Sequence, residues 1–143
     1  MEDELRDCMV AFLLKHRICV LTTSGTGGAW AMPARYRPLA EAVVSRHLEV
    51  ECLLPRWADA IYHLEQCPQA LLIIVEAQGI GLRWLQYQAT AQPVALPDWP
   101  RLLPRGVSQV RPEDRYSVVR LTPQRIDLID ESRGWGARET LDL

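Results

Sequence analysis

The chain has 143 residues, of which 48% are hydrophobic and 24% are charged, and its formal net charge is −2. This composition is typical of a soluble globular protein and argues against a disordered chain. A nucleic-acid-binding domain usually carries an excess of basic residues, so we expect no nucleic-acid partner. The length favours one domain over residues 1–143.

The patterns of cysteine, histidine and terminal residues exclude further classes of protein. The four cysteines have no C-x-x-C spacing and the three histidines form no H-x-x-x-H pair, so we expect no metal site. The N-terminus is acidic, unlike a signal peptide. No apolar run approaches the ~20 residues of a membrane-spanning helix. The expected location is therefore the cytoplasm, without membrane contact.

The first part of the chain predicts a helix and then a β-hairpin. Apolar residues recur at three- and four-residue spacing over 3–16, as in an amphipathic helix. Apolar and β-branched residues over 18–23 predict a strand, and the glycines of 24–28 predict a hairpin loop. A second strand is expected over 30–37, with Pro33 at an edge or a bulge because proline cannot donate to a sheet.

The rest of the chain predicts further strands and one more principal helix. Pro55 is expected to open that helix and Pro68 to end it. The continuous apolar run over 70–75 predicts a strand that is buried on both faces. Other strands are expected over 48–53, 82–94, 116–121, 125–130 and, as a short extended piece, 139–143, with a proline-rich loop over 96–114. Strands at hairpin spacing favour an antiparallel barrel over a parallel sheet.

This order of elements resembles the pyridoxamine 5′-phosphate oxidase-like family of FMN-binding split β-barrels. The resemblance covers nearly the whole chain and is carried by RICVLTTSGTGGAWAMP, DAIYHLEQCPQALLIIV, RWLQYQATAQPV and YSVVRLTPQRIDLIDESRGWGARETL. It implies an all-β fold with flanking helices, namely a split antiparallel β-barrel of about six strands. It also implies FMN as the cofactor and a homodimer with the cofactor groove at the subunit interface.

Seven residues are candidates to bind that cofactor. The resemblance implies that the phosphate is held by basic residues on the second strand and at the start of the following helix, and arginine forks match phosphate geometry. A tryptophan ring offers stacking area to a flat cofactor. Trp135 lies between two glycines, so its ring could reach across a dimer. The candidates are Arg35, Tyr36, Arg37, Arg56, Trp57, Trp84 and Trp135. Each arginine could instead lie on a solvated surface, and each tryptophan in the core.

The chain departs from the family pattern at one basic position. Lys15 is the only lysine, so an anion site must rely mainly on arginines, backbone N–H groups or helix ends. The family commonly has a lysine eight residues before the helix-ending proline, and this position is Ala60 here. Arg56 could take the role of that lysine. A milder departure is Ala89-Thr90-Ala91, where the family often has glycine and then alanine.

The leading functional prediction is an FMN-dependent oxidoreductase of unknown substrate, in which the flavin carries out the redox chemistry. No catalytic residue is assigned. The alternative is a flavin-free barrel, or one that binds haem or a deazaflavin, acting as a binding module. An oligonucleotide-binding barrel is a third hypothesis, which the net charge of −2 does not favour.

Overall fold

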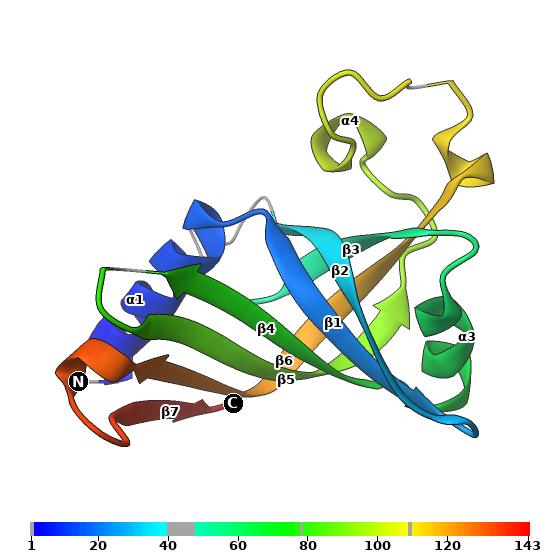
Figure 1. Ribbon diagram of the computed structural model, residues 1–143. Coiled ribbons are helices and arrows are strands. Elements are labelled where there is room, and N and C mark those ends of the chain that lie inside the picture. Colours follow the sequence, from blue (N-terminus) through cyan, green and yellow to red (C-terminus); the bar gives the residue numbers. More distant parts are fainter. Residues whose placement is uncertain (1, 40–47, 78, 109) are drawn as a thin grey trace.

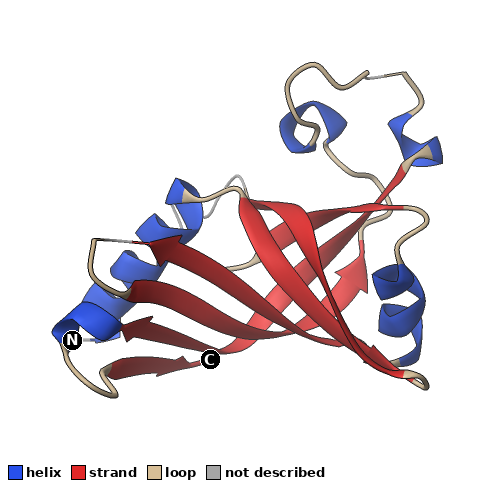
Figure 2. Ribbon diagram, in the orientation of Figure 1, coloured by secondary structure: helices blue, strands red, loops and turns tan. Residues whose placement is uncertain are grey.

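The computed structural model describes residues 2–39, 48–77, 79–108 and 110–143. Seven strands form one sheet, and every strand is antiparallel to its neighbours. The helices α1 and α3 lie at opposite ends of the strands, while α4 stands apart above one end (Figures 1 and 2). Mostly short connections leave no room for the crossover helices of a parallel sheet.

The elements follow the predicted order. The helices are α1 (Glu2–Lys15), α3 (Asp59–Gln66) and α4 (Trp99–Leu102), with the 3₁₀ turns η1 (Pro112–Asp114) and η2 (Glu131–Arg133). The strands are β1 (Ile18–Gly25), β2 (Gly28–Pro38), β3 (Val50–Pro55), β4 (Gln69–Ala77), β5 (Leu82–Pro93), β6 (Tyr116–Asp130) and β7 (Arg138–Asp142).

A pairing between β3 and β6 closes six of the strands into a ring. The sheet order is β3-β2-β1-β4-β5-β6-β7, and β3 pairs with β6 in addition. Because β6 is 15 residues long, its residues 116–121 can pair with β3 while residues 125–129 pair with β7. The predicted split antiparallel β-barrel of about six strands is confirmed, with β7 as an extra strand outside the ring.

Two local predictions that involve prolines are wrong. The two strands expected over 116–121 and 125–130 are one strand, because β6 stays paired with β5 through Pro123, which lies in the gap between the β3 and β7 partners on the other side. A shift of register beside Gln88 and Ala89 absorbs one extra residue there. Pro55 ends β3 rather than opening α3, since it is still paired with Tyr116.

The barrel interior is filled by side chains that alternate along each strand. Leu21, Tyr36, Cys52, Leu72, Ile74, Leu85, Tyr87, Leu121 and Ile126 are all fully buried. Helix α1 covers one end with Met9, Phe12 and Leu13. The Tyr36 hydroxyl donates to the Leu13 carbonyl at 2.7 Å, which ties α1 to β2. None of the described helices is long and apolar enough to cross a membrane.

Three buried carboxylates each gather several cations. Glu51 pairs with Arg101 and Arg120, and so holds the α4 segment against β3 and β6. Asp127 pairs with Arg138 at 2.8 Å and with Arg125 at 3.3 Å. Such a carboxylate is costly to bury unless its charge is compensated. Much of the arginine content is therefore structural.

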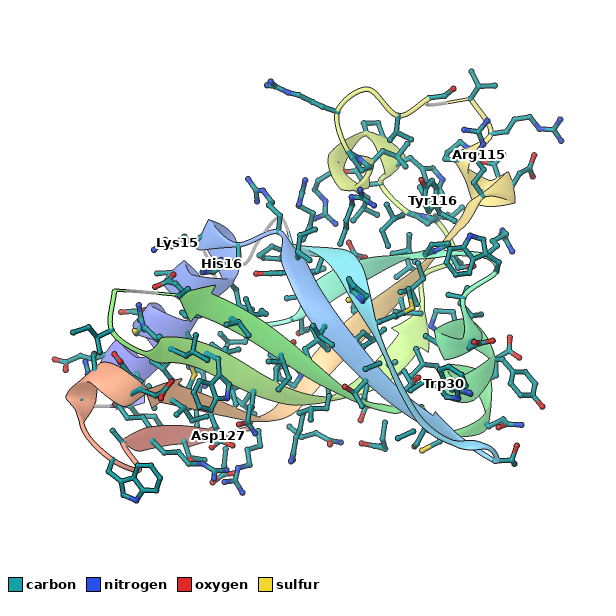
Figure 3. All side chains as sticks on the ribbon, viewed as in Figure 1. Lys15, His16, Trp30, Arg115, Tyr116 and Asp127 are labelled. Carbon is teal, nitrogen blue, oxygen red and sulfur yellow. The ribbon has the colours of Figure 1, made fainter. Side chains whose placement is uncertain are left out.

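The third carboxylate, Glu76, attaches the end of α1 to β4 and β5. It contacts Lys15 at 2.9 Å, His16 at 2.8 Å and Arg83 at 3.4 Å. The hydrogen bond from Lys15 lowers the pKa of Glu76, and the one from His16 adds to this effect against the opposing effect of burial. Figure 3 shows Lys15 and His16 at this end of the molecule.

Replacing Tyr87 by Phe tests the closure of the ring. The Tyr87 hydroxyl lies 2.6 Å from the Leu48 carbonyl and 3.1 Å from the Leu121 carbonyl, so one proton serves both oxygens beside the β3–β6 pairing. Tyr87→Phe leaves these buried acceptors without that donor and is expected to lower the free energy of unfolding in urea by about 1–3 kcal/mol. The exposed Tyr62 is the control, because Tyr62→Phe should change the free energy by less than about 0.5 kcal/mol. Equal effects in the two variants would contradict this role of Tyr87.

Candidate functional site

Two cavities flank the start of α3. The smaller has a volume of about 340 Å³ and is lined by Thr23, by residues 30–33 of β2, and by residues 55 and 57–60. We call it the tryptophan pocket, because Trp30 and Trp57 belong to its lining. The larger, which we call the groove, has a volume of about 810 Å³ and lies between α3, the end of β5 and the start of β6.

The tryptophan pocket presents two large aromatic rings to solvent. Trp30 is 54% exposed and Trp57 is 82% exposed, although both belong to the lining of the same hollow. Met32 and Pro33 add apolar surface, and Asp59 is the one charged residue of the lining. Figure 3 shows Trp30 beside α3. Exposed apolar and aromatic surface gathered in a concave site is typical of a small-molecule binding site.

A histidine supports the inner wall of the tryptophan pocket. Thr23 is paired directly with Trp30 across the β1–β2 hairpin, and its hydroxyl lies 3.0 Å from Nδ1 of the buried His63. The His63 ring lies 6.4 Å from the Trp30 ring. A Cβ at Gly25 would lie 2.6 Å from Cδ2 of His63, so only glycine leaves room for this ring. The hairpin glycine predicted from sequence thus also positions the wall of the pocket.

The groove is lined mainly by apolar side chains, with three charged residues among them. Ile61 and Leu64 of α3 line one side, and Arg56, Glu65 and Glu113 supply the charge. Nε of Arg56 donates to the Glu113 carbonyl, which holds this arginine toward the groove. The predicted phosphate ligand Arg56 therefore lies in the lining of the groove and not in that of the tryptophan pocket.

The structure does not gather the other predicted arginines into a site. Arg35 is exposed on β2 and Arg37 donates to the Tyr36 carbonyl at 3.0 Å. Burial lowers the pKa of Arg37, and the nearby charges of Arg17 and Arg101 lower it further. None of the described cavities has Arg35 or Arg37 in its lining.

The predicted aromatic residues are also dispersed. Of the four predicted aromatic residues, only Trp57 belongs to the lining of the tryptophan pocket. Tyr36 is buried in the core under α1, so its side chain is unavailable to a ligand. Burial also raises the pKa of its hydroxyl. Trp84 lies on β5 with Nε1 donating to Gln86 at 2.9 Å. Trp135 is fully exposed in the turn before β7, between Gly134 and Gly136, which both have positive φ.

Sequence reasoning missed Trp30 and Asp59 of the pocket lining, and His63 behind its inner wall. Trp30 follows the pattern of a core strand residue, and nothing local shows that it lines the same pocket as Trp57. His63 lies on a helix face without a motif. Asp59 follows the pattern of an acidic first turn, which is common in helices. Among the residues that the structure describes, no group of three or more His, Cys, Asp or Glu side chains could hold a metal ion.

Comparisons with known proteins identify the fold. No protein-family model matches the chain, and no curated protein matches it. A solved structure from Clostridium acetobutylicum, related to general stress protein 26 of B. subtilis (pyridoxinephosphate oxidase family), matches with a TM-score of 0.72 and 10% identity over 100% of this chain and 97% of that one. The chain has the pyridoxamine 5′-phosphate oxidase-like fold. This confirms the fold that the sequence resemblance implies.

Two other structures with this split-barrel fold carry names that refer to cofactors. A FAD-binding protein from Mesorhizobium loti has a TM-score of 0.59 and 13% identity, covering 95% of this chain and 93% of that one. A heme binding protein from Mycobacterium smegmatis has a TM-score of 0.67 and 18% identity, covering 94% of this chain but 57% of that longer one. At these identities the likeness establishes the fold.

Replacing Gly25 by Ala tests the wall of the tryptophan pocket. The added methyl group would meet the His63 ring, so Gly25→Ala is expected to displace this ring, break its contact with Thr23 and cost about 1–3 kcal/mol of stability. Gly27→Ala is the matched control, because nothing lies within 4 Å of a Cβ at that position. Urea unfolding and the aromatic NMR signals of His63 report the two effects. An unshifted His63 signal in Gly25→Ala would refute this packing.

Proposed function

We propose that the protein binds a flat cofactor of the flavin class in the tryptophan pocket. The observation that carries this proposal is the pair of exposed rings, Trp30 and Trp57, in the lining of one cavity of about 340 Å³. Its volume lies near the lower end of the range of about 300–1,000 Å³ for ligand sites, which suits one ring system. The name of the FAD-binding structure with the same fold supports the choice of flavin.

FMN, the form that the sequence resemblance implies, fits this pocket only in part. Its ring fits the apolar and aromatic lining. Its phosphate needs donors or cations, and the described lining holds no arginine or lysine but does hold Asp59. Arg56, the predicted substitute for a lysine at Ala60, lies in the groove lining. The residues present therefore fit the flavin ring and do not fit the phosphate.

With this cofactor, the proposed function is that of an oxidoreductase whose substrate is unidentified. A bound flavin would itself supply the hydride-transfer chemistry. The residues of this chain would bind the ring between Trp30 and Trp57 and shield it from water with Met32 and Pro33. The Thr23 hydroxyl, held by Nδ1 of His63, is the polar group of the inner wall that can orient the edge of a ring.

A flavin-free barrel that binds haem is the second candidate, because a structure with this fold is named a heme binding protein. Haem iron usually needs an axial His, Cys, Met or Tyr ligand, and Met32 is the one such residue in the lining of the tryptophan pocket. The absorbance spectrum of freshly purified protein separates the two candidates, since flavin and haem absorb differently. The spectrum also reports a deazaflavin.

We also propose that two copies of the chain form a homodimer through the outer face of the sheet. The run over 70–75 is buried on its inner face only, against the prediction of two buried faces. Val75 of β4 is exposed and is paired with Trp84 of β5. On the other side of β4, Ile73 is paired with Val20 of β1. Together with Ile18 these residues form a continuous apolar outer face. A patch of this kind on a soluble protein favours a protein interface.

Replacing Trp57 by Ala tests the flavin proposal. Loss of one stacking ring is expected to weaken riboflavin binding roughly three- to tenfold in calorimetric titration. Trp135→Ala is the matched control, because this exposed ring lies in the turn before β7. The Trp135→Ala variant should bind riboflavin with the affinity of the unmodified chain. The opposite pattern would place the ring at Trp135 instead. Absence of binding to the unmodified chain would refute the proposal.

A charge on the apolar outer face tests the homodimer. Val75→Glu would bury a carboxylate in the proposed interface and is expected to shift the chain from dimer to monomer in sedimentation velocity. Leu96→Glu is the control, because this residue is also an exposed apolar residue but belongs to the groove lining. A monomeric unmodified protein at micromolar concentration would contradict the proposed dimer.

A further inference from the structure

We propose that Asp59 makes the tryptophan pocket selective for a planar ring without phosphate, uncharged or cationic, over the phosphorylated form of the same ring. This inference rests on the proposed function, because it concerns the ligand of the same pocket. It names a residue that determines specificity and the charge class of the ligand. It also replaces FMN, the cofactor expected from the sequence resemblance, with a ligand that matches the residues present.

Within the part of the chain that the structure describes, no neighbouring side chain neutralises the charge of Asp59. Among the described residues it takes part in no ion pair or hydrogen bond, whereas the buried carboxylates Glu51, Glu76 and Asp127 each have basic partners. Asp59 is exposed, and it is the one charged residue in the lining of the pocket.

The helix terminus beside the pocket does not reverse this charge. Backbone N–H groups in the first turn of a helix attract anions, with a dipole equivalent to about half a unit charge. Asp59 is the first residue of α3, so its own full negative charge already occupies that position. A phosphate that approached the same N–H groups would meet the carboxylate at close range.

The nearby arginines do not compensate either. Arg56 is three residues away in sequence, but its Nε is held by the Glu113 carbonyl and its side chain lines the groove. Arg35 and Arg37 are absent from the lining of the pocket. The described lining therefore repels an anion and accepts a neutral or cationic ring between Trp30 and Trp57.

The expected size of the effect follows from the exposure of the carboxylate. Two charges about 4 Å apart in water interact by about 1 kcal/mol, and salt screens the interaction further. FMN and riboflavin have the same ring and ribityl chain and differ in the phosphate. At low salt we expect the full chain to bind riboflavin at least about threefold more tightly than FMN, with the difference decreasing as salt is added.

Variants at position 59 test whether Asp59 sets this preference. Asp59→Asn removes the charge and is expected to raise the affinity for FMN roughly threefold while leaving riboflavin binding within about twofold. Asp59→Lys replaces repulsion by attraction and is expected to make FMN the tighter ligand. Glu65→Gln is the matched control: it removes the same charge from the same helix, but Glu65 lines the groove. The control should leave the ratio of the two affinities unchanged.

The outcomes separate this inference from the proposed function. Riboflavin preferred by the unmodified chain, with the preference lost in Asp59→Asn but kept in Glu65→Gln, supports it. FMN bound tenfold more tightly than riboflavin by the unmodified chain would overturn the inference and leave the flavin proposal standing. An unchanged ratio in both Asp59 variants would also overturn it. Binding of neither ligand would refute the proposed function and this inference together.

Discussion

The pairing of β3 with β6 is the contact on which the rest of the structure depends. Without it the sheet would have two open edges, at β3 and β7, and unpaired edges attract other strands. With it, β3 is buried on both sides, by the barrel interior and by the α4 segment that Glu51 and Arg101 attach. The ring thus encloses most of the buried core.

Ring closure also decides where ligands can bind. Since Pro55 is still paired with Tyr116, the chain leaves the ring only at the residues that follow, and α3 must cover the adjacent end of the barrel. The helix does not fill that end completely. The tryptophan pocket remains on the side of the β1–β2 hairpin, and the groove remains on the side of β5 and β6. Arg56 and Trp57, adjacent in sequence, are divided between these two cavities.

Most of the strands could be predicted from sequence because alternation of apolar residues is a local signal. The continuity of β6 could not, since a proline within a strand usually ends it, and only the gap between two partner strands explains Pro123. The candidate site could be predicted from sequence to a smaller extent than the strands. Trp57 was among the predicted site residues, but only the folded structure shows that Trp30 lines the same pocket. Sequence also could not show that Arg56 lines the groove while Arg35 and Arg37 lie in the lining of neither cavity.

The position of Lys15 has a practical consequence for chemical labelling. It is the single lysine of the chain, and its side chain is 62% exposed even while it contacts Glu76. Figure 3 shows it at the opposite end of the molecule from Trp30. Among side chains, amine-reactive reagents therefore have one lysine to attach to. A dye coupled there would lie far from Trp30 of the pocket, and a solid support coupled there would leave that end of the molecule accessible.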